Sequence, residues 1–105
     1  MNLVDSCGWL EYFADGPNAD FFTPPIEDTK NLIVPTICIY EVFKRVCQQR
    51  GEGAALQAIA LMHQGKIISL DDTSALHAAK CSIDHNLPMA DSTILAISRL
   101  KKATI

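Results

Sequence analysis

Short apolar runs alternate along this sequence with longer stretches in which apolar residues recur every three or four positions. The short runs predict strands at residues 3–4, 32–34 and 66–70, and a further strand that begins at Ala103. The periodic stretches predict helices over residues 8–13, 36–50, 54–64, 71–85 and 89–101. Short strands that alternate with helices predict an α/β fold of three layers, in which helices cover both faces of a mainly parallel central sheet.

Polar residues mark the expected ends of these helices. Ser6, Thr36 and Asp72 are placed to cap the helices that follow them, because their side-chain oxygens can accept first-turn backbone N–H groups. Asn86 is expected to end its helix in the left-handed conformation.

Residues 18–31 are harder to assign. A helical turn is expected over residues 19–22, and the Thr23-Pro24-Pro25 sequence is expected to break it. The apolar residues of this segment could form an exposed patch used for association: Phe21, Phe22, Pro24, Pro25 and Ile26.

Length and composition restrict the possible classes of protein. The 105 residues fit one domain, residues 1–105, and the net charge of -3 gives no global basic field for nucleic acid. The four cysteines form no Cys-x-x-Cys pair, which favours reduced thiols over disulfides or a zinc site. The N-terminus does not resemble a signal peptide and no apolar run is long enough for a bilayer, so we expect a cytoplasmic protein without a membrane partner.

Two of the twelve acidic residues occupy unusual positions. Asp5 ends the first predicted strand, where side chains reach the crevice beyond a parallel sheet. Asp91 lies in the first turn of its helix and is expected to share the inward stripe of Ile94, Leu95 and Ser98. A carboxylate on such a stripe is costly unless it is paired or binds a cation, although the helix N-terminus alone also favours an acid there.

Glu41 stands out less on its own position. It is expected to lie opposite the apolar stripe of its helix, and Lys44 and Arg45 follow it by three and four residues. An exposed ion pair on a helix surface would explain this spacing equally well.

Three segments around these acids resemble the motifs of PIN-domain ribonucleases of the VapC toxin type. Residues 1–6 (MNLVDS) resemble the opening strand with its aspartate, residues 35–42 (PTICIYEV) the second motif with its glutamate, and residues 87–96 (LPMADSTILA) the third motif. The three occur in the family's order and span essentially the whole chain. The resemblance implies that Asp5, Glu41 and Asp91 are catalytic and bind the metal.

Gathered carboxylates repel one another, and a hard cation such as Mg²⁺ or Mn²⁺ removes that cost. Such a cation can activate water for attack on a phosphodiester, so no serine or cysteine nucleophile is needed. The resemblance therefore implies a metal-dependent endoribonuclease, a toxin with an RNA substrate and a cognate antitoxin, and a homodimer. Ser6, Lys44 and Arg45 are weaker candidates for RNA contact, because exposed cations also serve as an ordinary solvated face.

The sequence also departs from the family pattern. The resemblance implies a further aspartate after the strand that begins at Ala103, followed by a last strand, and neither is present. We therefore expect a domain incomplete at its C-terminus, with a weaker metal site and an unpaired sheet edge. A PIN-like module that binds an antitoxin or a second copy without cutting RNA remains an alternative. A phospho-acceptor domain is a third possibility, but no second acid stands beside Asp5.

Overall fold

A computed structural model describes residues 1–105. Its strands are β1 (Asn2–Leu3), β2 (Leu32–Pro35) and β3 (Lys66–Ile68). Its helices are α1 (Ser6–Phe13), α2 (Ala19–Glu27), α3 (Thr36–Arg50), α4 (Glu52–Met62), α5 (Asp72–His85) and α6 (Met89–Leu100), with a 3-10 turn, η1, at Thr29–Asn31. None of these helices combines the length and apolar character that crossing a bilayer requires.

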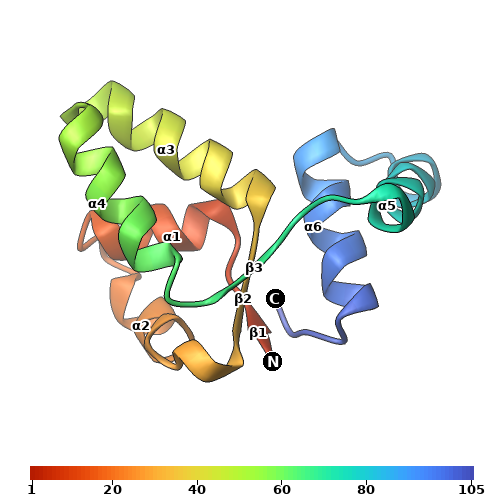
Figure 1. Cartoon of the computed structure of the whole chain (residues 1–105), viewed down its shortest axis with the longest axis horizontal. Coiled ribbons are helices and arrows are strands. Elements are labelled where there is room, and N and C mark those ends of the chain that lie inside the picture. The colour runs from red at the N-terminus through yellow and green to blue at the C-terminus, as the bar shows by residue number, and fades with distance from the viewer.

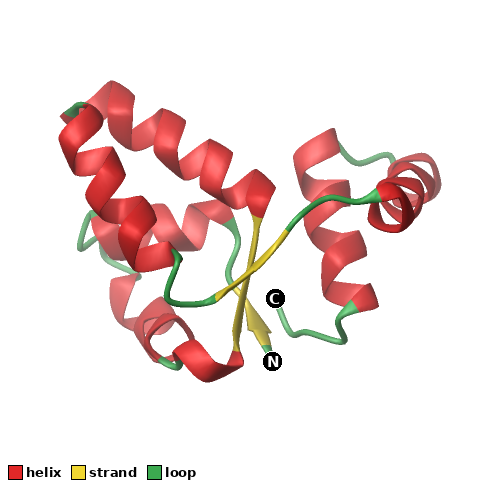
Figure 2. Ribbon diagram, viewed as in Figure 1, coloured by secondary structure: helices red, strands yellow, loops and turns green.

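The three strands form one parallel sheet in the order β1-β2-β3 (Figure 2). The expected strand at Ala103 contributes a parallel bridge between Asn2 and Thr104 on the other side of β1. There the Leu3 N–H donates to the Thr104 carbonyl oxygen at 2.7 Å, and the two chain termini lie close together (Figure 1). Helices α1 to α4 lie on one side of the strands and α5 and α6 on the other, which confirms the three-layer α/β/α prediction (Figure 1).

The core is built around the sheet. All four residues of β2 are buried, as expected of a strand covered on both faces, and Trp9 on α1 is completely buried beside it. Helix α3 buries Cys38, Val42 and Val46, which recur every four residues on one face. The predicted apolar stripe of this helix is therefore confirmed at Val42 and Val46.

The predicted helix caps are each displaced by one residue. Asp5, and not Ser6, occupies the N-cap of α1, where its Oδ1 accepts the Gly8 N–H at 2.9 Å. Thr36 is already the first residue of α3, which follows Pro35 without a side-chain cap. The wider reach of the Asp5 carboxylate explains the first difference, since Ser6 is engaged elsewhere.

The N-cap of α5 is also displaced by one residue from its predicted position. Asp71, and not Asp72, is its N-cap, and Asp71 and Ser74 form a reciprocal capping box. Two hydrogen bonds from Ser74 lower the pKa of Asp71. The helix ends at Asn86, whose φ of 52° confirms the predicted left-handed terminator.

The prediction that the prolines break residues 19–22 is wrong. Helix α2 continues through Pro24 and Pro25 to Glu27. The two proline nitrogens cannot donate to the preceding turn, but the Thr23 hydroxyl donates to the Ala19 carbonyl oxygen at 2.9 Å. Burial of Ile26 in the core provides the tertiary packing that outweighs the local preference.

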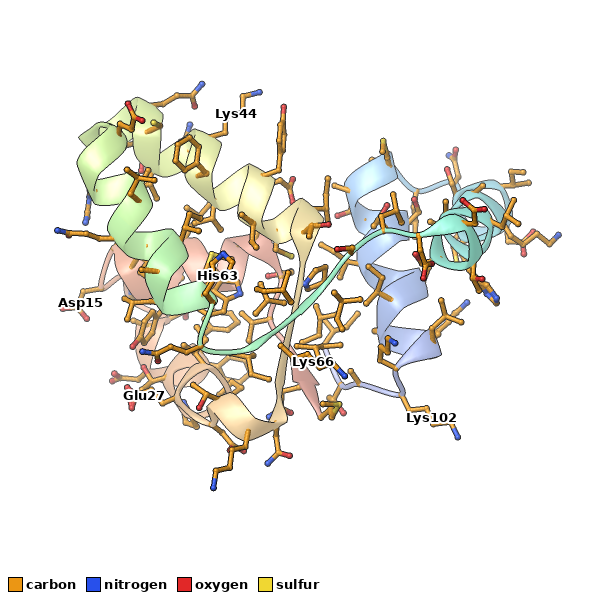
Figure 3. The ribbon with its side chains drawn as sticks, viewed as in Figure 1. Asp15, Glu27, Lys44, His63, Lys66 and Lys102 are labelled. Carbon is orange, nitrogen blue, oxygen red and sulfur yellow. The ribbon has the colours of Figure 1, made fainter.

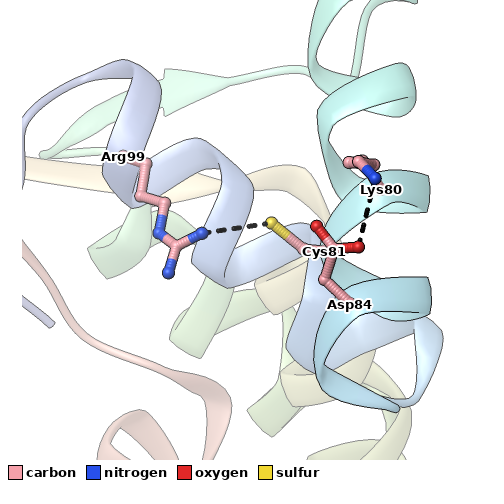
Figure 4. Close-up of polar contacts among 4 residues, drawn as sticks. All are labelled: Lys80, Cys81, Asp84 and Arg99. Carbon is pink, nitrogen blue, oxygen red and sulfur yellow. Dashed lines mark hydrogen bonds and ion pairs between the residues drawn. The ribbon is translucent and has the colours of Figure 1, made fainter.

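Helices α5 and α6 pack against each other as a pair on their side of the sheet (Figure 1). An Arg99 guanidinium N–H of α6 donates to the Cys81 sulfur of α5 at 3.7 Å (Figure 4). Lys80 and Asp84 form the structure's single ion pair, at 3.2 Å along the exposed face of α5. All four cysteines are free, as expected.

Candidate active site

Helices α1, α3 and α6 begin at the same edge of the structure, next to the carboxyl ends of β1 and β2 (Figure 1). β1 leads directly into α1, and β2 leads directly into α3. The first turns of α6 lie beside the start of α3, although α6 follows a different part of the chain. Ligand sites of parallel α/β sheets form beyond this edge, so the topology brings the three predicted acids to one end of the molecule.

Asp5 has a structural task as well as a proposed catalytic one. Its half-buried carboxylate uses Oδ1 to cap α1 through the Gly8 N–H. The other carboxylate oxygen accepts no hydrogen bond from the protein. One oxygen therefore fixes the side chain while the other remains available to a ligand.

Glu41 is held in place by a residue that lies far from it in sequence. The Ser6 hydroxyl donates to Glu41 Oε1 at 2.5 Å, and Ser6 itself is buried. Hydrogen bonds to a charged acceptor are stronger than those between neutral groups. This contact ties the start of α1 to α3, and it makes Ser6 better placed to orient Glu41 than to touch RNA.

The expected surface ion pair of Glu41 is absent. Neither Lys44 nor Arg45 pairs with a carboxylate, because the single ion pair of the structure is the one on α5. Lys44 instead lies with its Nζ 5.9 Å from the centroid of the Tyr40 ring. Glu41 is half-buried, so the prediction that it lies opposite the buried face of α3 is wrong.

Asp91 is exposed, so its predicted inward orientation is wrong. Its neighbours Ile94 and Ser98 are buried as expected. The difference arises because Asp91 lies in the first turn of α6, where the helix emerges from between α5 and the sheet. At this position the carboxylate faces the open edge, which a cation or substrate can reach.

Cys7 lies two residues after Asp5, and its thiol is subject to the charges of the three acids. Burial of its surroundings raises the pKa of the Cys7 thiol most, and the negative charges of Asp5, Glu41 and Asp91 raise it further. The Cys7 side chain is nevertheless exposed. Nothing in the sequence patterns singled out Cys7, although its position two residues after Asp5 was a usable signal.

Cys38 lies deeper beneath the same region. Burial raises the pKa of its thiol to about 12, the Ser6 hydroxyl lowers it, and the charges of Glu41 and Asp5 raise it. A completely buried thiol below the carboxylates gives them an apolar floor.

The donor set suits a hard divalent cation by its chemistry. Carboxylate oxygens predominate, and Mg²⁺ prefers oxygen ligands while it retains several waters. No three His, Cys, Asp or Glu side chains lie close enough together to chelate an ion directly. By the chemistry of their side chains, Asp5, Glu41 and Asp91 are the residues that would hold such an ion.

A cleft of about 630 Å³ opens beside this edge, between β1, α2 and the last two residues. Asp5 and Cys7 line it together with the apolar residues Phe21, Phe22 and Pro25. Phe21 is exposed, as expected of the association patch, whereas Ile26 is buried and does not belong to it. The apolar wall of the cleft thus begins next to Asp5.

The sequence profile of the PIN domain matches residues 3–105. The chain belongs to the PIN domain family. The match covers nearly the whole sequence, so all three acids lie within the PIN domain. Comparison with curated proteins finds no match.

Two solved structures resemble this PIN domain in fold. A toxin–antitoxin complex from Klebsiella pneumoniae has a TM-score of 0.81 at 16% identity, over 98% of this chain and 82% of that one. The Mycobacterium tuberculosis toxin VapC20, described as cleaving the sarcin–ricin loop, has a TM-score of 0.82 at 14% identity, over 98% of this chain and 85% of that one. At these identities the likeness establishes the PIN fold.

Proposed function

We propose that this PIN domain is a metal-dependent endoribonuclease that acts as the toxin of a toxin–antitoxin pair. The observation that carries the proposal is the hydrogen bond from Ser6, the neighbour of Asp5, to Glu41 at the edge where α6 also begins with Asp91 in its first turn. Like charges that share one region oppose folding unless a cation offsets them. A site that binds a cation and a phosphodiester would explain why the three acids lie at one edge of the sheet.

Each acid has a defined task in this proposal. Asp5 and Glu41 are fixed by the Gly8 N–H and the Ser6 hydroxyl, so they would bind Mg²⁺ or Mn²⁺ without losing side-chain freedom. Asp91 is exposed and would complete the ion's environment from the opposite helix. The bound cation would supply electrostatic stabilisation for attack of water on the RNA phosphodiester.

The partners are proposed from the relatives. The Klebsiella structure is a toxin–antitoxin complex, and VapC20 is described as a toxin that cleaves the sarcin–ricin loop. We therefore propose an RNA substrate, a cognate antitoxin, a homodimer and a cytoplasmic location for this chain. The apolar cleft beside Asp5 offers an antitoxin a surface next to the acids.

The test is RNA cleavage by the purified chain in Mg²⁺ or Mn²⁺, with EDTA as the metal-free control. Asp5→Asn, Glu41→Gln and Asp91→Asn should each lower cleavage at least tenfold, because each removes one charged ligand while it keeps the side-chain shape. Asp84→Asn is the matched control, since Asp84 is an acid on the far helix α5. Cleavage that persists in EDTA or in the three variants would contradict the proposal. The proposal would also be contradicted if RNA cleavage were absent both from this chain and from a form extended by the further aspartate and the last strand of the family pattern.

A binding module without nuclease activity is the second candidate. It is favoured by the absence of a ready-made chelating group among the described side chains. Asp5→Asn separates the two: it should abolish RNA cleavage by an enzyme, but leave antitoxin binding by a module unchanged.

A further inference from the structure

We infer that Tyr40 and Lys44 form a nucleotide-binding step beside the acids, with the Tyr40 ring stacking on an RNA base and Lys44 pairing with a neighbouring phosphate. The inference rests on the proposed function and adds a binding role that the three acids cannot fill. Negative carboxylates repel the RNA backbone, so the chain needs an attractive surface close to them. The overall charge of -3 does not supply one.

The Tyr40 ring has no packing role that accounts for its position. It is 60% exposed on α3, immediately before the half-buried Glu41. Neighbouring residues on a helix point about 100° apart, so the ring projects from the same turn of α3 as Glu41 and away from the buried face of the helix. An exposed aromatic face one residue from a proposed metal ligand offers a stacking surface to any base.

Lys44 completes the step one helical turn further along. Its Nζ lies over the Tyr40 ring at 5.9 Å from the centroid, so the ammonium occupies one face of the ring and a base would stack on the other. Lys44 is exposed, has no carboxylate partner, and extends from α3 into solvent (Figure 3). A base on the ring would therefore bring its phosphate within reach of an unpaired cation, with Arg45 next to it.

The arrangement favours an unpaired nucleotide over a duplex. A base within a duplex is already stacked on both faces and cannot cover the ring. The step would therefore hold a single-stranded or looped residue next to the phosphodiester that the acids face. It would contribute to substrate binding and leave the chemical step unchanged.

The test is binding of a short fluorescent oligoadenylate in EDTA, measured by anisotropy, which involves neither metal nor cleavage. Tyr40→Leu should weaken binding about tenfold, while Tyr40→Phe should stay within about twofold, because only the ring face is needed. Lys44→Gln should lower the slope of log Kd against log salt concentration by about 0.7. Lys30→Gln, an exposed lysine on η1, is the control and should change neither.

Unchanged binding by Tyr40→Leu would overturn the inference. So would an equal loss for an RNA duplex of the same sequence length, or the absence of oligoadenylate binding by the unaltered chain. The outcome is separable from that of the nuclease proposal. Ring-dependent binding without metal-dependent cleavage would refute only the nuclease, whereas cleavage with an unchanged KM in Tyr40→Leu would refute only the step.

Discussion

Replacement of Gly8 by alanine tests how closely the start of α1 packs against Val4 and Phe22. In most helices a Gly→Ala change stabilises by about 0.5–1 kcal/mol, because it reduces the freedom of the unfolded chain. Here an added Cβ would lie 2.6 Å from Val4 Cγ1 and 2.8 Å from Phe22 Cδ1. Half-buried Phe22 can rotate away, but buried Val4 in the core cannot. Overpacking of this kind costs about 1–3 kcal/mol, so Gly8→Ala should destabilise by about 1 kcal/mol.

Gly53 on α4 is the matched control, because nothing lies within 4 Å of its added Cβ. Gly53→Ala should therefore stabilise by about 0.5 kcal/mol, and the two variants should differ in sign. Urea unfolding followed by circular dichroism measures both. If Gly8→Ala is as stable as the unaltered chain, or more so, the close approach of Gly8 to Val4 and Phe22 is not as described. Because the Gly8 N–H holds Asp5, RNA cleavage by Gly8→Ala should also fall further than its folded fraction.

Three further results are expected. Ser6→Ala should lower the free energy of unfolding by about 1–2 kcal/mol in urea titrations, because it removes a charge-assisted hydrogen bond to the α3 glutamate. Cys38 carries a pKa of about 12 in the folded chain against 9.0 as the ordinary value, so its contribution to stability is complete below pH 9 and declines as pH rises toward 12. The fall in the urea midpoint above pH 9 should therefore be shallower in Cys38→Ala, and an unchanged slope would exclude this cause. Iodoacetamide should modify Cys7 faster in Asp91→Asn than in the unaltered chain at pH 8, because one of the charges that raise the pKa of Cys7 is gone. Asp84→Asn should leave that rate unchanged, and equal rates in all three proteins would mean that the acids do not face a common region.

The order of elements was predictable because it depends on hydrophobic periodicity, which survives small local errors. The strand at residues 32–34 and the helix from residue 36 to Arg50 were found in this way. The caps were misplaced because Ser, Thr and Asp all favour N-cap positions, and only the fold decides which of two adjacent polar residues is used. The prediction for residues 19–27 was wrong for a different reason. The helix-breaking tendency of Pro24 follows from the sequence, whereas the burial of Ile26 that outweighs it depends on the tertiary fold.

The candidate site likewise combines features that follow from the sequence with features that depend on the fold. Asp5 could be inferred from its position at a strand end, since parallel sheets place such residues at one edge. The setting of Glu41 could not, because the hydrogen bond from Ser6 joins residues that only the folded chain brings together. Cys7 and Tyr40 were missed because neither belongs to a recurrent motif, and their importance depends on which charges and cations surround them.

The pairing of Asn2 with Thr104 has a consequence for how the molecule assembles. β1 pairs on one side with β2 and on the other side with a single bridge from the far end of the sequence. Closing so long a loop is slow, so β1 should spend time paired on one side only while the chain folds. The loop that carries Asp5 and Cys7 leaves β1 directly, and its final position would therefore be among the last to form. The loop that carries Asp5 would therefore reach its final position only after the segment around Thr104 had been synthesised.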